Sequence, residues 1–149
     1  MKIITVNKKA GFDYFVEETF EAGIVLEGSE VKSCRQGNVN LRDSFALIRD
    51  GQVWLKNAHI SPYEHQSAYN SKDPRRDRKL LLHKSEIRKM VGKIQQKGYT
   101  LVAMKMYFKD ALVKVELALC RGKQAHDKKD AIRARDLDRA AQREIADFK

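Results

Sequence analysis

The sequence predicts a mainly β protein with a few helices, and three observations support this prediction. Residues 113–119 alternate apolar with mostly polar side chains, which is typical of a strand with one buried face. Asp50-Gly51 separates two short apolar runs, 45–50 and 52–56, and this dipeptide favours a two-residue β-hairpin turn. Before the C-terminal region, only residues 83–98 show a long helical period, so helices are expected to form a minor part of the fold.

The first part of the chain predicts shorter elements. Residues 14–18 begin with aromatic and β-branched side chains, a strand pattern that two glutamates weaken. Residues 21–27 begin as a strand, which Gly28 interrupts. Residues 29–35 are then expected to form a short helix, with Ser29 as its N-cap and a carboxylate in the first turn, where it suits the helix dipole.

Residues 83–98 predict a longer helix with one apolar and one basic face. Its apolar residues follow the i, i+3, i+4, i+7 pattern. His83 and Glu86 have the spacing of a capping box, and Gly98 stands where a C-terminal cap is expected. The basic face is formed by Lys84, Arg88, Lys89, Lys93 and Lys97. Residues 59–78 contain both prolines without any periodicity and are predicted as a loop.

These elements add up to five to seven short antiparallel strands. Residues 101–108 and 113–119 are expected to pair through a turn at Asp110-Ala111. A small closed antiparallel barrel avoids exposed strand edges, and an OB-like β-barrel is the preferred form because it commonly presents one face to oligonucleotides. A half-barrel with a helical cap is the alternative. The predicted division is a barrel with helices over residues 1–121 and a basic C-terminal tail over residues 122–149.

The positive charge is concentrated in the second half of the chain. Residues 1–70 have a net charge of −1, whereas residues 71–149 have a net charge of +11. A concentrated basic field attracts polyanions, which favours nucleic acid as the partner; a solvated basic surface is the alternative. The chain has no apolar run of the roughly 20 residues that a membrane span needs, and no apolar segment long enough for a secretory signal. With two distant cysteines and no CxxC motif, the expected location is the reducing cytoplasm.

The sequence contains no arrangement typical of a catalytic or metal site. The histidines lack metal-ligand spacing, and no phosphate-binding glycine motif is present. Glu17 and Glu18 are adjacent, so in a regular strand they are expected on opposite faces. Cys34 is expected to be a buried thiol, and Trp54 a core or rim aromatic with RNA stacking as the alternative. We therefore expect a protein that is not an enzyme and uses no cofactor, metal or small-molecule substrate.

The region after Arg121 differs from the rest of the chain. It has dense mixed charge and few large apolar residues. Ala134, Leu137, Ala141 and Ile145 keep helical spacing but form a thin apolar stripe that would bury little surface. The prediction is a tail that is disordered when free and helical when bound.

Several separated motifs together resemble one family. They are NKKAGFDYFVEE at 7–18, EAGIVLEGSEVKSCRQG at 21–37, N-x-x-D-S-F-A-L at 40–47, DPRRDRKLLLH at 73–83 and GKQAHDKK at 122–129. In this order they resemble the SmpB family, the SsrA-binding proteins of bacterial ribosome rescue. The resemblance implies an OB-fold barrel that binds the tRNA-like domain of transfer-messenger RNA and accompanies it to stalled ribosomes for trans-translation. It also implies elongation factor Tu in the delivery complex, a tail that enters the empty mRNA channel near the decoding centre, and no reaction of the protein's own.

The resemblance also assigns residues to two sites. The RNA-contacting surface would include Asn7, Lys8, Tyr14, Glu21, Glu30, Lys32, Arg35, Arg75, Arg76, Arg78, Lys79, Leu81 and His83. The decoding-centre motif would include Gly122, Lys123, His126, Asp127, Lys128 and Lys129. The family commonly has G-K-K and D-K-R in the tail, whereas this chain has Gln124 and Lys129 at the last positions. Lysine keeps the charge of arginine but lacks its planar fork.

Glu21 leads to a specific hypothesis about recognition. A carboxylate repels RNA unless it accepts a hydrogen bond from a base, so Glu21 is expected to specify the RNA while lysines and arginines hold it. The alternative is that Glu21 pairs with a neighbouring lysine or arginine. At the level of function, the alternatives are a ribosomal or general RNA-chaperone protein, which should bind many structured RNAs alike, and an RNA-processing enzyme.

Overall fold

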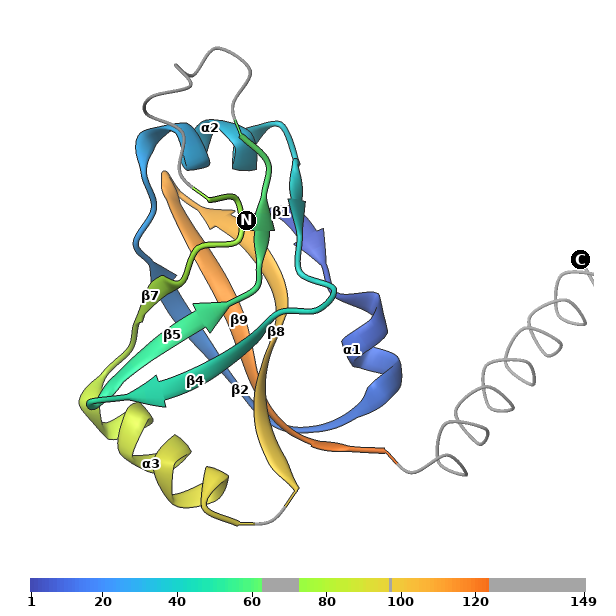
Figure 1. Ribbon diagram of the computed structural model, residues 1–149, viewed down its shortest axis with the longest axis vertical. Helices are drawn as coiled ribbons and strands as arrows, with labels where there is room; N and C mark the ends of the chain where they lie inside the picture. The colour runs from blue at the N-terminus through green and yellow to red at the C-terminus, as the bar shows by residue number, and fades with distance from the viewer. Residues whose placement is uncertain (63–72, 97, 124–149) are drawn as a thin grey trace, which may run out of the picture.

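The computed structural model describes residues 1–62, 73–96 and 98–123, and these form a mainly β fold with a few helices (Figure 1). The predicted fold class is confirmed at this level. In chain order the elements are β1 (Lys2–Val6), α1 (Lys8–Asp13), β2 (Tyr14–Ile24), α2 (Gly28–Arg35), β3 (Val39–Asn40), β4 (Phe45–Arg49), β5 (Gln52–Lys56), β6 (His59–Ile60), β7 (Arg78–Leu81), α3 (Lys84–Ile94), β8 (Tyr99–Lys109) and β9 (Leu112–Gly122). The segment predicted as a loop over 59–78 thus begins with a short strand, and residues 63–72 lie outside the described residues.

Seven strands form one antiparallel sheet in the order β1-β8-β4-β5-β7-β2-β9, and β9 also pairs with β8. β3 and β6 form a separate two-stranded sheet. The longest ladders involve β9, which pairs with β8 from Leu112 to Arg121 and with β2 from Lys114 to Gly122. The predicted antiparallel pairing of the two last strands is confirmed. Figure 1 shows α2 at the end of the molecule opposite α3, with α1 at the side.

Two tight turns follow the chemistry of their residues. Between β4 and β5, Asp50 and Gly51 both have positive φ angles, 54° and 73°. Such a turn matches the twist of the paired strands, and only glycine and a few short polar residues adopt this conformation readily. Asp110, in the turn between β8 and β9, has φ 56°. Both predicted hairpins are therefore confirmed.

β2 corrects two expectations. It is one continuous strand from Tyr14 to Ile24, because its long ladder with β9 outweighs the poor strand propensity of the two glutamates. The register shifts between Val16 and Glu18, as at a β-bulge, and the bulge disturbs the alternation of side chains. Glu17 and Glu18 consequently both reach α3, so the expectation that they point to opposite faces is wrong.

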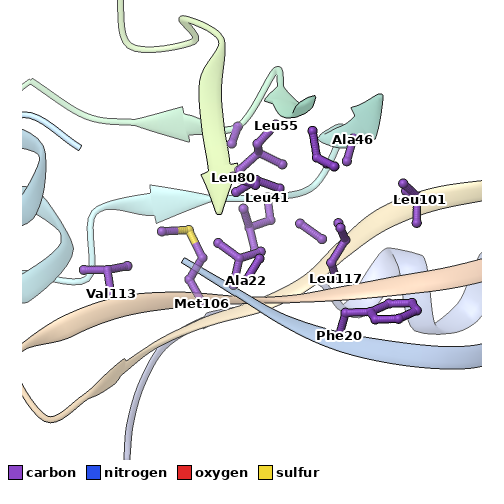
Figure 2. Close-up of a cluster of buried hydrophobic side chains, with 14 of the residues drawn as sticks. Phe20, Ala22, Leu41, Ala46, Leu55, Leu80, Leu101, Met106, Val113 and Leu117 are labelled. Atoms are coloured by element: carbon purple, nitrogen blue, oxygen red, sulfur yellow. The ribbon is translucent and has the colours of Figure 1, made fainter. Parts of the chain in front are cut away.

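The core lies between the inward faces of the strands. Figure 2 shows Leu55 and Leu80 directed towards Ala22, Met106 and Leu117 from the opposing strands. All five side chains are at most 2 % exposed. Along β9 the residues Val113, Val115, Leu117 and Leu119 are buried as the alternation predicts, but Ala118 and Cys120 are buried as well. The last part of β9 is therefore covered on both faces, which the sequence pattern did not indicate.

The helices agree with the predictions in part. At α3 the Glu86 carboxylate accepts a hydrogen bond from the His83 backbone N–H at 3.1 Å, as the capping-box spacing predicts. The helix ends at Ile94, so Gly98 is not its cap and instead lies, with φ 90°, before β8. α2 begins at Gly28 with Glu27 as N-cap, so the assignment of Ser29 as N-cap is wrong.

α1 was not predicted from the sequence. It is a short helix, and Asn7 caps it: the Asn7 side-chain oxygen accepts a hydrogen bond from the Ala10 backbone N–H at 3.2 Å. The Asn7 amide group donates to the backbone oxygens of Leu41 at 2.9 Å and Ala103 at 3.0 Å. One side chain therefore ties α1 to a loop and to β8.

A buried charge cluster joins α2 to the segment that leads into β7. The Glu30 carboxylate accepts hydrogen bonds from Arg78 Nε at 2.7 Å and from both Arg76 Nε, at 3.2 Å, and Arg76 Nη2. Arg78 is fully buried, and it also donates to the backbone oxygens of Ala58 at 2.7 Å and Pro74 at 2.9 Å. A buried guanidinium needs such partners, since an unpaired buried charge is costly.

The ionised form of Glu30 is favoured by these partners. Burial alone would raise the pKa of Glu30, but hydrogen bonds from Arg76, from the Glu27 backbone N–H and from Arg78 outweigh it and hold the pKa below the ordinary value of 4.5. A group whose pKa is lowered in the folded state contributes stability above its unfolded pKa. This contribution is lost as the pH falls through the lower, folded pKa.

We predict that Glu30→Gln lowers the free energy of unfolding by about 3–5 kcal/mol at pH 7, because it leaves the Arg78 guanidinium buried without its counter-charge. The same variant should lose less stability than the wild type when the pH falls below about 4.5, since its amide does not titrate. Urea denaturation at a series of pH values measures both effects.

Glu18→Gln is the matched control for this prediction. It removes the carboxylate that pairs with Lys89 at 2.7 Å on the surface, where the Lys89 side chain is 55 % exposed. Such pairs contribute about 0–1 kcal/mol. Equal losses of stability in the two variants would contradict a special role for the buried cluster.

Candidate nucleic-acid interface

The outer face of β7, β2, β9 and β8 brings predicted site residues together. Residues paired directly across antiparallel strands point to the same face of the sheet. Since Ala22 and Val115 point into the core, the alternate positions on their strands point outwards. In order across the strands, the outward positions are Leu81, then Glu21 and Gly23, then Lys114 and Glu116, then Lys105, Tyr107 and Lys109. We call these positions the outer face.

Glu21 is the exposed carboxylate at the centre of the outer face. The Tyr107 hydroxyl donates to Glu21 Oε2 at 2.5 Å, and Lys109 Nζ lies 3.2 Å from Glu21 Oε1. The hydrogen bond from Tyr107, together with Lys109, lowers the pKa of Glu21 below its ordinary value. Glu21 thus pairs with a neighbouring cation, Lys109, and the hydrogen bond from Tyr107 fixes the orientation of the carboxylate. The alternative that this pairing is the whole role of Glu21 stays a prediction.

Tyr107 provides that orientation from a nearly buried position. Tyr107 is only 5 % exposed, and Lys105 Nζ lies 5.9 Å from the centroid of its ring. Burial, followed by the hydrogen bond to Glu21, raises the pKa of Tyr107 to about 12. The phenol therefore remains a hydrogen-bond donor throughout the physiological pH range.

Leu81 extends the outer face with an apolar group. It pairs with Gly23 and is 51 % exposed. A Cβ atom at Gly23 would lie 3.3 Å from the Leu81 Cβ, so the glycine permits the close approach of the two strands here. His83 follows β7 on the surface, as the N-cap of α3.

Near α1, the predicted residues have different roles. Asn7 is 4 % exposed, and its side chain forms hydrogen bonds inside the protein. The structure therefore indicates a structural role for this side chain rather than direct contact with RNA. Lys8 is exposed in the first turn of the helix. Tyr14 is half-buried and lines a groove of about 290 Å³ that lies between α1 and residues 42–45. Across the groove, Lys9 Nζ lies 3.3 Å from Asp43 Oδ1.

The predicted residues of α2 and of the segment before β7 also divide into two groups. Lys32, Arg35 and Arg75 are exposed, and Lys79 is half-buried. Glu30 and Arg78 are 8 % and 0 % exposed and belong to the buried charge cluster. Their interpretation as RNA contacts is revised, because side chains saturated inside the protein position the surface rather than form it. Arg76 is half-buried and shares the Glu30 carboxylate.

The sequence-predicted residues do not converge on a single pocket. They occupy the outer face, the edge beside α1 and the surface of α2, and Figure 1 shows α2 at one end of the molecule and α1 at its side. This distribution suits an extended ligand rather than a small molecule. Gly122 and Lys123 lie at the end of β9, whereas His126, Asp127, Lys128 and Lys129 lie outside the described residues.

The basic face predicted for α3 is partly neutralised. Lys89 Nζ lies 2.7 Å from Glu18 Oε1, and Lys93 Nζ lies 3.8 Å from Glu17 Oε1. Lys84 and Arg88 are exposed, and Lys97 is not among the described residues. The cations of α3 thus contribute less net charge to the surface than their number suggests.

Tyr107, Lys109 and Lys114 belong to the outer face but were not predicted as site residues. Each has the ordinary appearance of a strand residue, and nothing within β8 or β9 distinguishes it. Only the pairing of both strands with β2 places them beside Glu21. No local sequence pattern could have identified them.

Metal ligands and thiols among the described residues are the next features of the site. They contain no group of three or more histidine, cysteine, aspartate or glutamate side chains that could hold a metal ion. Both cysteines are buried, and burial raises the pKa of Cys34 and of Cys120 to about 11, which makes them poor nucleophiles. None of the helices described has the length and apolar character of a membrane span.

Comparisons with known proteins place the chain in a family. The model of the SmpB protein family matches residues 4–147. An SsrA-binding protein of Trichodesmium erythraeum is 53 % identical over 147 residues, covering 99 % of this chain and 94 % of the relative. SsrA-binding proteins of Synechococcus elongatus and Ruminiclostridium cellulolyticum are 56 % and 57 % identical, each over 97 % of this chain and 94 % of the relative.

A solved structure agrees with these matches. It is described as "tmRNA-SmpB: a journey to the center of the bacterial ribosome", and it matches with a TM-score of 0.70 and 50 % sequence identity over 87 % of this chain and 94 % of the other. Sequence and fold therefore support the same assignment along nearly the whole chain. The chain belongs to the SmpB family.

Proposed function

We propose that this protein binds the tRNA-like domain of transfer-messenger RNA and brings it to stalled ribosomes for trans-translation. Membership in the SmpB family and the relatives' name, SsrA-binding protein, support this function. The observation that carries the proposal is the outer face, where lysines surround a carboxylate of fixed orientation at Glu21. A surface for phosphate alone would have no use for such a carboxylate.

The chemistry of the outer face fits a folded RNA. Lysine and arginine contacts to phosphate supply affinity that falls as salt rises, but they do not distinguish one RNA from another. Exposed bases in RNA loops offer N–H donors that a carboxylate can accept, and flat surfaces that aromatic or apolar side chains can cover. Glu21 and Leu81 meet these two requirements and lie on neighbouring strands.

The proposed contact surface consists of the exposed or half-exposed residues of the predicted set. These are Lys8, Tyr14, Glu21, Lys32, Arg35, Arg75, Lys79, Leu81 and His83, with Arg76 at the edge of the buried charge cluster. Asn7, Glu30 and Arg78 hold α1, α2 and β7 in place beneath them. Tyr107, Lys109 and Lys114 join the surface from β8 and β9.

The proposal includes the closed OB-like barrel. In its support, the pairings run from β8 through β4, β5, β7 and β2 to β9, and β9 pairs again with β8. The pairing of β4 with β8, through Ala46 and Leu101, involves a single residue pair and would be the weakest point of the closure. A closed barrel would hold the outer face rigidly, which favours recognition of one RNA shape.

The remaining parts of the proposal concern the delivery complex. The predicted boundary falls inside β9, which ends at Gly122, so the residues after it would form the separate tail that acts in the mRNA channel and at the decoding centre. Elongation factor Tu would accompany the complex. The protein would act in the cytoplasm, where ribosomes stall, and it would catalyse no reaction itself. The solved structure with transfer-messenger RNA and SmpB on the ribosome supports the ribosome as a partner.

Competition binding tests the proposed function directly. The full-length protein is offered a tRNA-like-domain RNA and an ordinary elongator tRNA over a series of salt concentrations. We expect a preference for the tRNA-like domain that persists as salt rises, because base and shape contacts do not depend on counterion release. Equal binding that collapses with salt would indicate a general basic RNA-binding protein and would overturn the proposal.

For Glu21→Gln we predict different effects on the affinity for the tRNA-like domain and on the affinity for elongator tRNA. Affinity for the tRNA-like domain should fall about ten-fold, the size expected for the loss of a base-specific hydrogen bond. Affinity for elongator tRNA should stay the same or rise slightly, because a repulsive charge has been removed. Since the pKa of Glu21 is already lowered, the wild-type preference should not change between pH 6 and pH 8.

Glu116→Gln is the control for this variant. Glu116 pairs with Glu21 across the strands, and its carboxylate lies 3.9 Å from Lys105 on the same outer face. The control removes the same charge at nearly the same place without touching the bond to Tyr107. If both variants change both affinities equally, Glu21 acts through charge alone and does not specify the RNA.

Removal of residues 123–149 should separate the two proposed sites. We expect the truncated protein to bind the tRNA-like domain with unchanged affinity, because the outer face lies entirely within the described sheet. Tagging of incomplete proteins on stalled ribosomes should be abolished. Loss of RNA affinity in the truncated protein, measured in the same competition assay, would contradict this division of roles.

A further inference from the structure

Phe15 has a position that RNA contact at the outer face does not explain. It pairs with Arg121 across β2 and β9, near the end of the sheet, and is 42 % exposed. Two cations lie over its ring: Arg121 Cζ is 5.7 Å and Lys123 Nζ is 5.0 Å from the ring centroid. The ring face attracts cations, so Phe15 holds both side chains at once.

The backbone is fixed at the same place. The ladder between β2 and β9 continues to the pair Tyr14 and Gly122. One residue further, the Lys123 backbone N–H donates to the Asp13 backbone oxygen at 2.8 Å. Lys123 is therefore held through its backbone by the segment that leads into β2, and through its side chain by Phe15. Twenty-six residues of the sequence follow it.

We propose that Phe15 is a positioning residue that sets the direction in which residues 124–149 leave the sheet. A single backbone hydrogen bond leaves the chain free to pivot about it. The second contact, between the Lys123 ammonium and the ring, restricts this freedom, and Arg121 contacts the same ring from the neighbouring strand. The inference rests on the proposed function, in which these residues must enter the mRNA channel while the sheet holds RNA.

The direction of exit affects the delivery of the tail to its site. A segment that starts in a fixed direction samples a smaller volume, which raises its effective concentration at a target that lies in that direction. Removing the ring should therefore lower tail-dependent activity and leave RNA binding unchanged. This separates a positioning role from base stacking, in which Phe15 would contribute to RNA affinity.

The test compares Phe15→Leu with Phe15→Tyr in the full-length protein. Leucine keeps an apolar side chain but removes the ring, whereas tyrosine keeps the ring. For Phe15→Leu we expect amide hydrogen exchange at Lys123, measured by NMR, to become about two- to five-fold faster, the range of an exposed cation–π contact. Tagging at limiting protein concentration should fall by a similar factor, with unchanged affinity for the tRNA-like domain. Phe15→Tyr should behave as the wild type.

Two further variants make the result specific. Arg121→Gln removes one cation without altering the ring and should accelerate exchange at Lys123 in the same direction. Phe108→Leu makes the identical substitution at a phenylalanine that pairs with Val113, at the other end of β9 from Arg121, and no change of exchange at Lys123 is expected. An equal acceleration of exchange in Phe108→Leu would show that the effect is not specific to the ring beside Lys123 and would overturn the proposal.

The other outcomes are equally decisive. Unchanged exchange at Lys123 in Phe15→Leu, or faster exchange with normal tagging, would overturn the positioning role. Lower affinity for the tRNA-like domain would assign Phe15 to RNA stacking instead. Failure of the proposed function is recognised separately, because the wild type would then show no RNA preference and no tagging, while the exchange measurement involves no RNA.

Discussion

The pairing of β9 with both β2 and β8 is the constraint on which the rest of the structure depends. It places Glu21 beside Tyr107, although 86 residues separate them in the sequence. It also places the last described residue beside the segment that opens β2. The carboxylates of β2 meet lysines from the second half of the chain, so that Glu17, Glu18 and Glu21 approach Lys93, Lys89 and Lys109. The glutamates of β2 thereby neutralise part of the positive charge carried by the second half of the chain.

Polar residues that are close together in one sequence motif can differ in this fold, since some are exposed and others are buried and form internal hydrogen bonds. Lys8 is exposed, whereas its neighbour Asn7 is buried and joins three segments by hydrogen bonds. Arg75 is exposed, whereas Arg78, three residues later, has no exposed surface. The Arg78 side chain can be buried here only because the Glu30 carboxylate and two backbone carbonyl groups accept hydrogen bonds from it. The surface that is available to a partner is therefore smaller than the motifs suggest, and it is held more rigidly.

Some features that local chemistry determines were predicted from the sequence, whereas the caps assigned to Ser29 and Gly98 and several features that distant pairing determines were not. Asp50-Gly51 and the capping box at His83 follow from the residues themselves. The continuity of β2 depends on a partner strand nearly a hundred residues away, and its bulge reverses the expected placement of a glutamate. α1 depends on the fixed position of Asn7, whose partners include Ala103. At the site, the motifs identified Glu21 and Leu81, but Tyr107 and Lys109 become visible only in three dimensions.

The burial of both cysteines has a practical consequence for labelling residues 124–149. Thiols react with maleimides and similar reagents as thiolates, and a pKa of about 11 leaves Cys34 and Cys120 almost fully protonated at neutral pH. A cysteine introduced among residues 124–149 whose thiol keeps its ordinary pKa would react much faster. Fluorophores or spin probes can therefore be attached there in the folded protein without first replacing the two native cysteines. The approach of the labelled segment to a ribosome can then be followed in a chain that differs from the natural one at a single residue.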